Sequence, residues 1–216
     1  MLTFVEEIVL LQLDDAQGKI VDLPLSVGAI VLAGAALMEL ALRNQIDTDL
    51  QQLFVVDASP TGDDILDDVL GHLAAIPGEF TTGAAIEDLS GRADGYRTKA
   101  FDHLVRKGIL RQQDGRFLWV FPTRRYPVID DREQREVKAR LRHLLLSEEI
   151  PDPRDVALIC LIEACGLLGL VLTANEAKRA APRVEQLNRM DLIGQALIRA
   201  VAEIRFIVRS AAAPGY

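Results

Sequence analysis

The stretch VALICLIEACGLLGLVLTA, residues 156–174, decides how this chain folds. It is long enough to cross a bilayer, which takes ~20 apolar residues, but Glu163 stands near its middle. A charged side chain at that depth costs roughly 2.5–3.5 kcal/mol on membrane insertion. We therefore predict a helix over residues 153–173 that other helices surround, since a helix that is apolar on all sides has to be buried.

The composition of the whole chain indicates a single domain built mainly from helices. Half of the 216 residues are hydrophobic, which is enough to bury a sizeable core, and only 5% are aromatic. Scarce aromatic residues beside plentiful Ala and Leu are typical of packed helices rather than of sandwiches or barrels. We predict one mainly α domain over residues 1–216, with a winged-helix-like segment and a β-hairpin.

A second apolar segment, VGAIVLAGAALM at residues 27–38, is too short to span a membrane and predicts a helix over residues 26–43. Side chains that can cap helices mark other starts. Thr3 and Glu6 form a capping-box pattern, and Ser59 or Thr61 is expected to cap the helix that begins near residue 63. Further helices are predicted at residues 81–91, 96–109, 131–146, 180–190 and 190–210, with two short strands within residues 45–59.

The segment GILRQQDGRFLWVFP, residues 108–122, predicts a β-hairpin over residues 109–121 that turns on Asp114 and Gly115. An Asp-Gly pair is the strongest short-range hairpin signal, because both residues accept the backbone angles of a tight turn. This hairpin follows a short helix, a turn and a second helix, which is the order of a winged helix. Residues 96–107 would then be the recognition helix, with Arg111 and Arg116 on the wing.

Positive charge is concentrated in one part of an acidic chain. Residues 92–142, here termed the basic segment, hold 14 Lys and Arg against 7 Asp and Glu, whereas the whole chain has a net charge of -8. This asymmetry favours an anionic partner on that side, although helical surfaces also carry charge without one. A winged-helix regulator that binds nucleic acid or protein is the alternative function. The acidic total charge and the lack of interleaved aromatic residues argue against nucleic acid.

The sequence holds no pattern that predicts catalysis. It contains neither HExxH nor GxSxG, and no glycine-rich loop that would cradle a phosphate. The histidines, His72, His103 and His143, have no cysteine or carboxylate partner at the spacing of a metal site, so we expect them at surface or boundary positions. We predict no enzyme activity, no cofactor and no metal ion.

The acidic loop DASPTGDDILDD, residues 57–68, carries several oxygen-bearing side chains in the order of a calcium loop. Pro60 disturbs the required turn, however, and Asp68 stands where a longer Glu is wanted. A helix N-terminus explains this loop better than a bound calcium ion does.

The cysteines and the N-terminus bear on localisation. Cys160 and Cys165 lie five residues apart in an apolar run and are expected to be free, buried thiols in a reducing compartment. The start, MLTFVEEIVLLQLDD, lacks the basic region and the cleavage site of a signal peptide. We expect a cytoplasmic protein that docks peripherally at a membrane.

Five blocks in a fixed order resemble the Golgi phosphoprotein 3 family over residues 2–204. They are LTFVEEIVLLQLDDAQGK, GAALMELALRNQI, DASPTGDDILDDVL, HLVRKGIL and DPRDVALICLIEACGLL. The resemblance implies a helical domain around a buried central helix, for which residues 156–174 are the candidate. It also implies a non-enzymatic peripheral membrane protein that binds the phosphatidylinositol 4-phosphate headgroup and holds the cytoplasmic tails of glycosyltransferases.

The resemblance also places the headgroup pocket in this sequence. The family's Trp and Arg near the first apolar helix fall on Pro24 and Ala33, and its two later Arg fall on Asp94 and Arg97. Only Arg97 keeps the family's residue type. Arg92 and Lys99 are close enough in sequence to substitute in part. We therefore predict a headgroup site of Arg92, Arg97 and Lys99 that binds anionic lipid with little specificity.

Two departures from the family pattern shape the remaining expectations. The chain starts at the first block, without the N-terminal extension of eukaryotic members, which suggests a bacterial member. The family's hydrophobic hairpin, used in self-association, is replaced by the short acidic segment SEEIPDPRD at residues 147–155. We expect a monomer or a weak oligomer.

Overall fold

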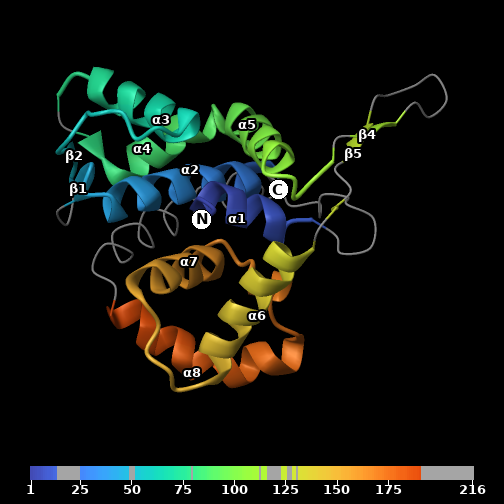
Figure 1. The fold of residues 1–216 in the computed structure, drawn as a ribbon. Coiled ribbons are helices and arrows are strands. Elements are labelled where there is room, and N and C mark those ends of the chain that lie inside the picture. The colour runs from blue at the N-terminus through green and yellow to red at the C-terminus, as the bar shows by residue number, and fades with distance from the viewer. Residues whose placement is uncertain are drawn as a thin grey trace, which may run out of the picture.

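The computed structural model describes residues 1–13, 25–48, 52–78, 80–111, 113–115, 123–125, 128–129 and 131–190. Helices dominate these residues, which confirms the mainly α fold class (Figure 1). The helices are α1 (Phe4–Leu11), α2 (Leu25–Leu42), α3 (Asp64–Ala75), α4 (Thr82–Ser90), α5 (Ala93–Arg106), α6 (Arg132–Leu146), α7 (Pro153–Ala164), the short 3-10 helix η1 (Leu168–Leu170) and α8 (Ala174–Met190). The strands are β1 (Ile46–Thr48), β2 (Gln52–Val55), β3 (Phe80–Thr81), β4 (Gln113–Gly115) and β5 (Thr123–Arg125).

Helix α2 forms the centre of the molecule. It contacts α1, α3, α4, α5 and α7, so its apolar residues are buried around the whole helix. In Figure 1, α3, α4 and α5 lie on one side of α2, and α6, α7 and α8 lie on the other. Segment 156–174, our candidate for the central helix, contributes α7, which packs between α2 and α8. The central position therefore belongs to the shorter apolar segment of the sequence.

Helix α7 ends at Ala164, nine residues before the predicted end at residue 173. Gly166 adopts a φ of 72°, in the left-handed region that glycine tolerates and most residues avoid. Its N–H donates to the Glu163 carbonyl, and the N–H of Leu167 donates to that of Ile162, which closes the helix end. The remaining apolar residues form a turn and η1, and they still pack against the core. The prediction of one continuous helix was wrong, whereas the prediction of burial is confirmed.

Two helix starts show how the sequence fixes local structure. At α1 the capping box is confirmed, because the Thr3 N–H donates to Glu6 Oε2 at 2.8 Å and the Glu6 N–H donates to Thr3 Oγ1 at 3.3 Å. At α3 the cap is Asp63 rather than Ser59 or Thr61. Its Oδ1 accepts the N–H groups of the second and third residues of the helix, at 3.0 and 3.1 Å.

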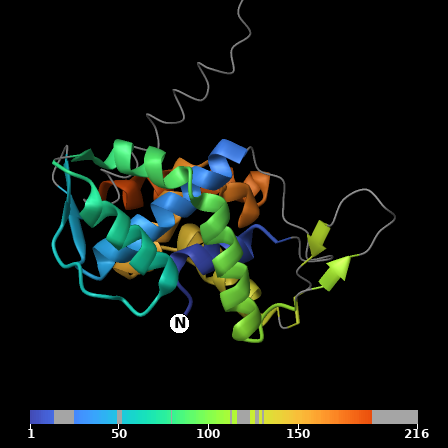
Figure 2. The ribbon, with the colours of Figure 1, turned by 90° about the horizontal axis from the view of Figure 1, so that it is seen from above.

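The strands form two small antiparallel units. Strands β1, β2 and β3 make a sheet in which Ile46 pairs with Val55, so the two short strands predicted within residues 45–59 are confirmed. Strands β4 and β5 make the expected hairpin, which extends away from the helices (Figure 2). Asp114 pairs with Arg124 inside the ladder. The predicted turn on Asp114 and Gly115 was therefore wrong, and the hairpin continues beyond residue 121.

Helix α8 begins at residue 174, six residues before the predicted start, because Thr173 and Glu176 form a capping box. The N–H of Thr173 donates to Glu176 Oε2 at 2.9 Å, and the N–H of Glu176 donates to Thr173 Oγ1 at 3.4 Å. The sequence TANE thus carries a start signal that periodicity alone did not reveal. The predicted helix over residues 190–210 lies outside the described residues, apart from Met190.

This cap predicts a pH dependence of stability. The hydrogen bond from Arg142, together with those from Thr173, lowers the pKa of Glu176 from its usual 4.5 to about 2. A lowered folded-state pKa means that the carboxylate stabilises the fold above pH 4.5 and that this contribution is lost as the pH falls toward 2. We expect Glu176→Gln to melt at a lower temperature than the parent at neutral pH, with the two melting temperatures converging on acidification. A constant difference across a pH series of melting curves would contradict this assignment.

Candidate functional site

Arg97 is a largely buried basic side chain that lies close to the start of helix α2. Helix α5 presses it against the first turn of α2, where a Cβ added to Gly28 would lie only 2.9 Å from an Arg97 terminal nitrogen. The Arg97 side chain is 22% exposed, and its Nε is buried without a hydrogen-bond partner among the described residues. Its ion pair with Asp94 is long, at 3.5 Å, and the Asp94 side chain is 94% exposed. Solvent screening makes such a pair weak.

The surroundings of Arg97 are suited to an anion. The first turn of α2 contains no acidic residue. Free N–H groups and the helix dipole make the start of a long helix positive, so a guanidinium held there is repelled unless a negative group joins it. In the described part of the chain, Arg97 and the first turn of α2 form a position at which a phosphate or carboxylate oxygen would contact both.

The structure does not bring the three predicted headgroup residues together. Arg92 pairs through its terminal nitrogen with Asp68 of α3 at 3.0 Å, and Lys99 donates from Nζ to the main-chain carbonyl of Asp64 at 2.9 Å. Both side chains therefore turn toward α3, while Arg97 lies against α2. Arg92 and Lys99 therefore lie on a different face of α5 from Arg97, and their contacts connect α5 to α3.

The pocket position that residue counting assigned to α2, Ala33, does not lie beside Arg97. Ala33 is fully buried in the core, so a side chain at that position does not reach a surface pocket. The α2 residue that faces Arg97 is Gly28, five residues earlier. Pro24 lies outside the described residues.

Internal ion pairs neutralise much of the basic segment. The pairs within its described part include Arg92 with Asp68, Arg97 with Asp94, Lys107 with Glu6, Arg135 with Asp131, Arg140 with Glu7 and Asp155, and Arg142 with Glu176. Arg106 and Arg111 stay exposed on the described surface. Many basic residues of the segment therefore form internal ion pairs instead of a free basic surface, and the charge count alone could not show this.

Several of these ion pairs neutralise carboxylates that are buried in the core. Glu6, Glu7 and Glu39 are 0, 4 and 5% exposed on α1 and α2. Lys107 Nζ lies 2.6 Å from Glu6 Oε1, and Arg140 lies 2.8 Å from Glu7 Oε1. Burial still raises the pKa of the Glu7 carboxyl, because the loss of water outweighs the nearby guanidinium groups. The sequence predicts Glu6 as part of a capping box but does not predict that the three carboxylates are buried.

Arg154 joins the same network from α7. Its terminal nitrogens lie 2.9 Å from Glu39 Oε2 and 2.8 Å from the main-chain oxygen of Leu2. The guanidinium carbon also lies 4.1 Å from the centre of the Phe4 ring. One side chain therefore connects the N-terminus, α1, α2 and α7.

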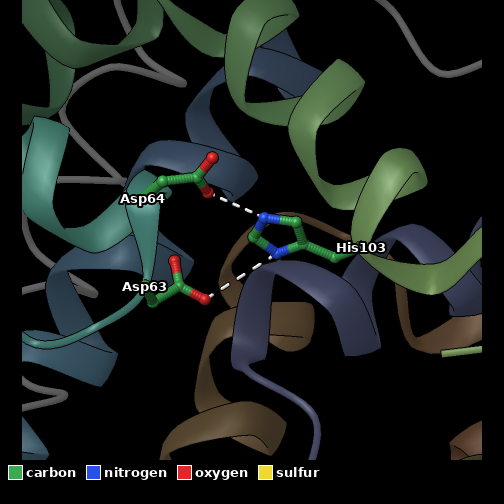
Figure 3. Close-up of side chains that lie close together, drawn as sticks. All are labelled: Asp63, Asp64 and His103. Carbon is green, nitrogen blue, oxygen red and sulfur yellow. Dashed lines mark ion pairs between the residues drawn. The ribbon is translucent and has the colours of Figure 1, made fainter. Parts of the chain in front are cut away.

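The histidines have carboxylate partners after all, contrary to what sequence spacing implied. His72 pairs with Asp88, and His143 Nε2 lies 2.8 Å from Glu149 Oε2. His103 is 8% exposed and stands between α5, α3 and α1. Its two ring nitrogens face the side chains of Asp64 and Asp63 (Figure 3). These partners are some 40 residues away in sequence, so no local motif reveals them.

The acidic loop at residues 57–68 serves the start of α3, as predicted. Asp57 Oδ1 accepts the Ser59 N–H at 2.8 Å, and Asp67 Oδ1 accepts the Thr61 N–H at 2.6 Å. Asp68, the last position of the calcium-loop pattern, is paired with Arg92 instead. These bonds are those of a turn that leads into a capped helix.

None of the helices in the described part of the chain combines the length and the apolar character that a bilayer crossing requires.

Comparison with known proteins identifies the family. The profile of Golgi phosphoprotein 3 (GPP34) matches residues 4–204, which is nearly the whole chain. Vacuolar protein sorting-associated protein 74 of Eremothecium gossypii is 28% identical over 225 aligned residues, which cover 86% of this chain and 67% of that protein. The helical fold around α2 and the ordered sequence blocks agree with this match. The chain belongs to the Golgi phosphoprotein 3 family.

Proposed function

We propose that this chain is a non-enzymatic peripheral membrane and adaptor module that docks on anionic lipid through Arg97 and the first turn of α2. The observation that carries the proposal is the setting of Arg97, a largely buried cation whose terminal nitrogen lies at the first turn of α2 and whose Nε has no partner among the described residues. An anionic headgroup at this position would add a negative charge beside Arg97, whose described ion-pair partner is the exposed Asp94. Membership of the Golgi phosphoprotein 3 family supports the same role.

The rest of the proposed function follows the family. We propose that the module works as a monomer or weak oligomer on the cytoplasmic side of a membrane, where the tails of membrane proteins are its second partner. The similar protein from Eremothecium gossypii is named for vacuolar protein sorting, which is in keeping with an adaptor role.

Binding is proposed to be generic for negative charge. Each basic residue near an anionic surface contributes ~1 kcal/mol, so one such site gives weak and salt-sensitive docking. Asp94 stands one turn from Arg97 and repels a phosphate. We therefore expect less than about a tenfold preference for phosphatidylinositol 4-phosphate over other anionic lipids at equal charge, which corresponds to 1.4 kcal/mol.

Liposome co-sedimentation at low salt tests the site. Arg97→Ala is expected to lower the affinity for anionic vesicles about fivefold, the equivalent of ~1 kcal/mol. Arg106→Ala is the matched control, because it removes the same charge from the exposed end of the same helix. Equal losses in the two variants, or equal binding of the parent to neutral and anionic vesicles, would refute the proposed site.

Soluble inositol phosphate headgroup tests the specificity. We expect that it competes with anionic vesicles no better than inorganic phosphate does at equal charge. Displacement at micromolar headgroup would show a true headgroup pocket, and the proposal of generic binding would then be wrong.

Nucleic acid is the less favoured partner. The helix order of a winged helix is present, but Lys107, at the end of the would-be recognition helix, is bonded to the buried Glu6. A side chain that is needed to neutralise a buried carboxylate is not free to contact a DNA phosphate. A gel-shift experiment at low salt is expected to show no retained duplex DNA.

A further inference from the structure

Asp63, Asp64 and His103 bring together three side chains that can bind a metal ion. Their ligand atoms lie within 4.8 Å of one another (Figure 3). His103 Nε2 lies 2.7 Å from Asp64 Oδ1, and His103 Nδ1 lies 3.8 Å from Asp63 Oδ2. The two aspartates come from the start of α3 and the histidine from the middle of α5. The cluster therefore links helix α3 to helix α5.

The charges around the cluster call for one more cation. Glu6, Asp63 and Asp64 supply three carboxylates. The nearby ammonium groups are those of Lys107, which is bonded to Glu6, and Lys99, which is bonded to the main-chain carbonyl of Asp64. Even when both are counted in full, one negative charge beside the largely buried His103 is uncompensated. A metal ion can balance it.

The orientation of the imidazole favours a metal ion. Nδ1 faces inward, 3.5 Å from Oε1 of the buried Glu6, while Nε2 faces the half-exposed Asp64. A carboxylate behind one ring nitrogen is the usual arrangement of a metal-binding histidine, since it keeps the proton on that nitrogen and leaves the other free to bind. Asp63 uses Oδ1 for its helix cap, and its Oδ2, which lies 3.8 Å from Nδ1, has to shift toward Nε2 to reach an ion bound there.

We propose that Asp63, Asp64 and His103 bind a divalent transition metal ion of the zinc type. One imidazole nitrogen with carboxylate oxygens suits zinc, whereas calcium and magnesium prefer oxygen ligands alone. Zinc holds such ligands at ~2.0–2.2 Å, which separates two of them by more than the 2.7 Å between His103 Nε2 and Asp64 Oδ1, so the Asp64 side chain, 58% exposed, moves outward to admit the ion while water completes the coordination. The ion joins α3 to α5 and has a structural role.

Zinc titration of the apo protein tests this site independently of lipid binding. We expect zinc chloride to raise the melting temperature and calorimetry to give one zinc ion per chain. Asp64→Asn, at an exposed position, is expected to keep the fold and to lower zinc affinity more than about tenfold, as is typical when a metal site loses a member. His103→Gln is expected to remove the zinc response.

Two other histidines provide the controls. His72→Gln and His143→Gln each remove a histidine that has a carboxylate partner, half-buried at His72 and exposed at His143, and both variants are expected to keep the full zinc response. Cobalt(II) offers a second readout, since binding to the parent should give visible absorption bands that Asp64→Asn lacks. The proposal is overturned if zinc leaves the melting temperature unchanged, or if Asp64→Asn and His103→Gln bind zinc like the parent.

Discussion

Replacing Arg154 by alanine is expected to lower the free energy of unfolding by about 3–5 kcal/mol, the usual cost of leaving a buried charge without its partner. The side chain is bonded to Glu39 and to the main chain of Leu2, and it covers the Phe4 ring. Its loss would leave the Glu39 carboxylate, 5% exposed, with Arg43 as its remaining ion-pair partner. Because whole domains are stable by only ~5–15 kcal/mol, this change endangers the fold.

Urea unfolding, followed by far-UV circular dichroism, measures this effect. Arg189→Ala is the matched control, because Arg189 forms an exposed ion pair with Glu185 one turn away. Such pairs contribute ~0.3–0.5 kcal/mol. Arg154→Lys keeps the charge but loses one arm of the fork, and an intermediate stability is expected. If Arg154→Ala unfolds at the same urea concentration as Arg189→Ala, the buried network does not hold the N-terminus to α7 as described.

Asp94→Arg is expected to strengthen binding to anionic vesicles more than tenfold. The change replaces a repelling carboxylate with a guanidinium one helical turn before Arg97. Removing one repelling charge and adding one attracting charge near an anionic surface is worth ~1 kcal/mol each, about 2 kcal/mol together, whereas tenfold in affinity takes 1.4 kcal/mol. Vesicle titration at fixed ionic strength gives the affinity, and competition with soluble headgroup shows whether specificity rises with it.

Asp102→Arg separates a local site from a general effect of net charge. Asp102 is exposed on the same helix, about two turns further on, and its replacement changes the net charge by the same amount. We expect a much smaller gain in affinity from this variant. Equal gains would mean that lipid senses only the total charge, and the Arg97 position would then have no special role.

Local sequence signals predicted most helices because their causes are local. The capping box of Thr3 and Glu6, the apolar run that becomes α2 and the helix of residues 132–146 are each determined within a few residues. The early end of α7 was also foreseeable, since Gly166 takes the left-handed conformation that ends many helices. The apolar run continues beyond Gly166, however, so the hydrophobic pattern did not indicate that the helix ends there.

The candidate sites were harder to predict because they depend on packing between distant segments. His103 meets Asp63 and Asp64 only when α5 lies across the start of α3. Charge counting marked residues 92–142 as basic, but it could not show that Lys107 and Arg140 are used to neutralise buried glutamates. Counting along α2 likewise selected Ala33, whereas the side of the helix that meets Arg97 is set by Gly28.

The central place of α2 has a consequence for synthesis on the ribosome. Helix α2 is complete at Leu42, but α7, which covers one of its sides, begins at Pro153, about 110 residues later. At ~5–20 residues per second, a nascent chain carries that uncovered apolar surface for several seconds or longer. Chaperones that hold unfolded chains, and a lower growth temperature, are therefore expected to raise the yield of native protein more than any change to its folded surface.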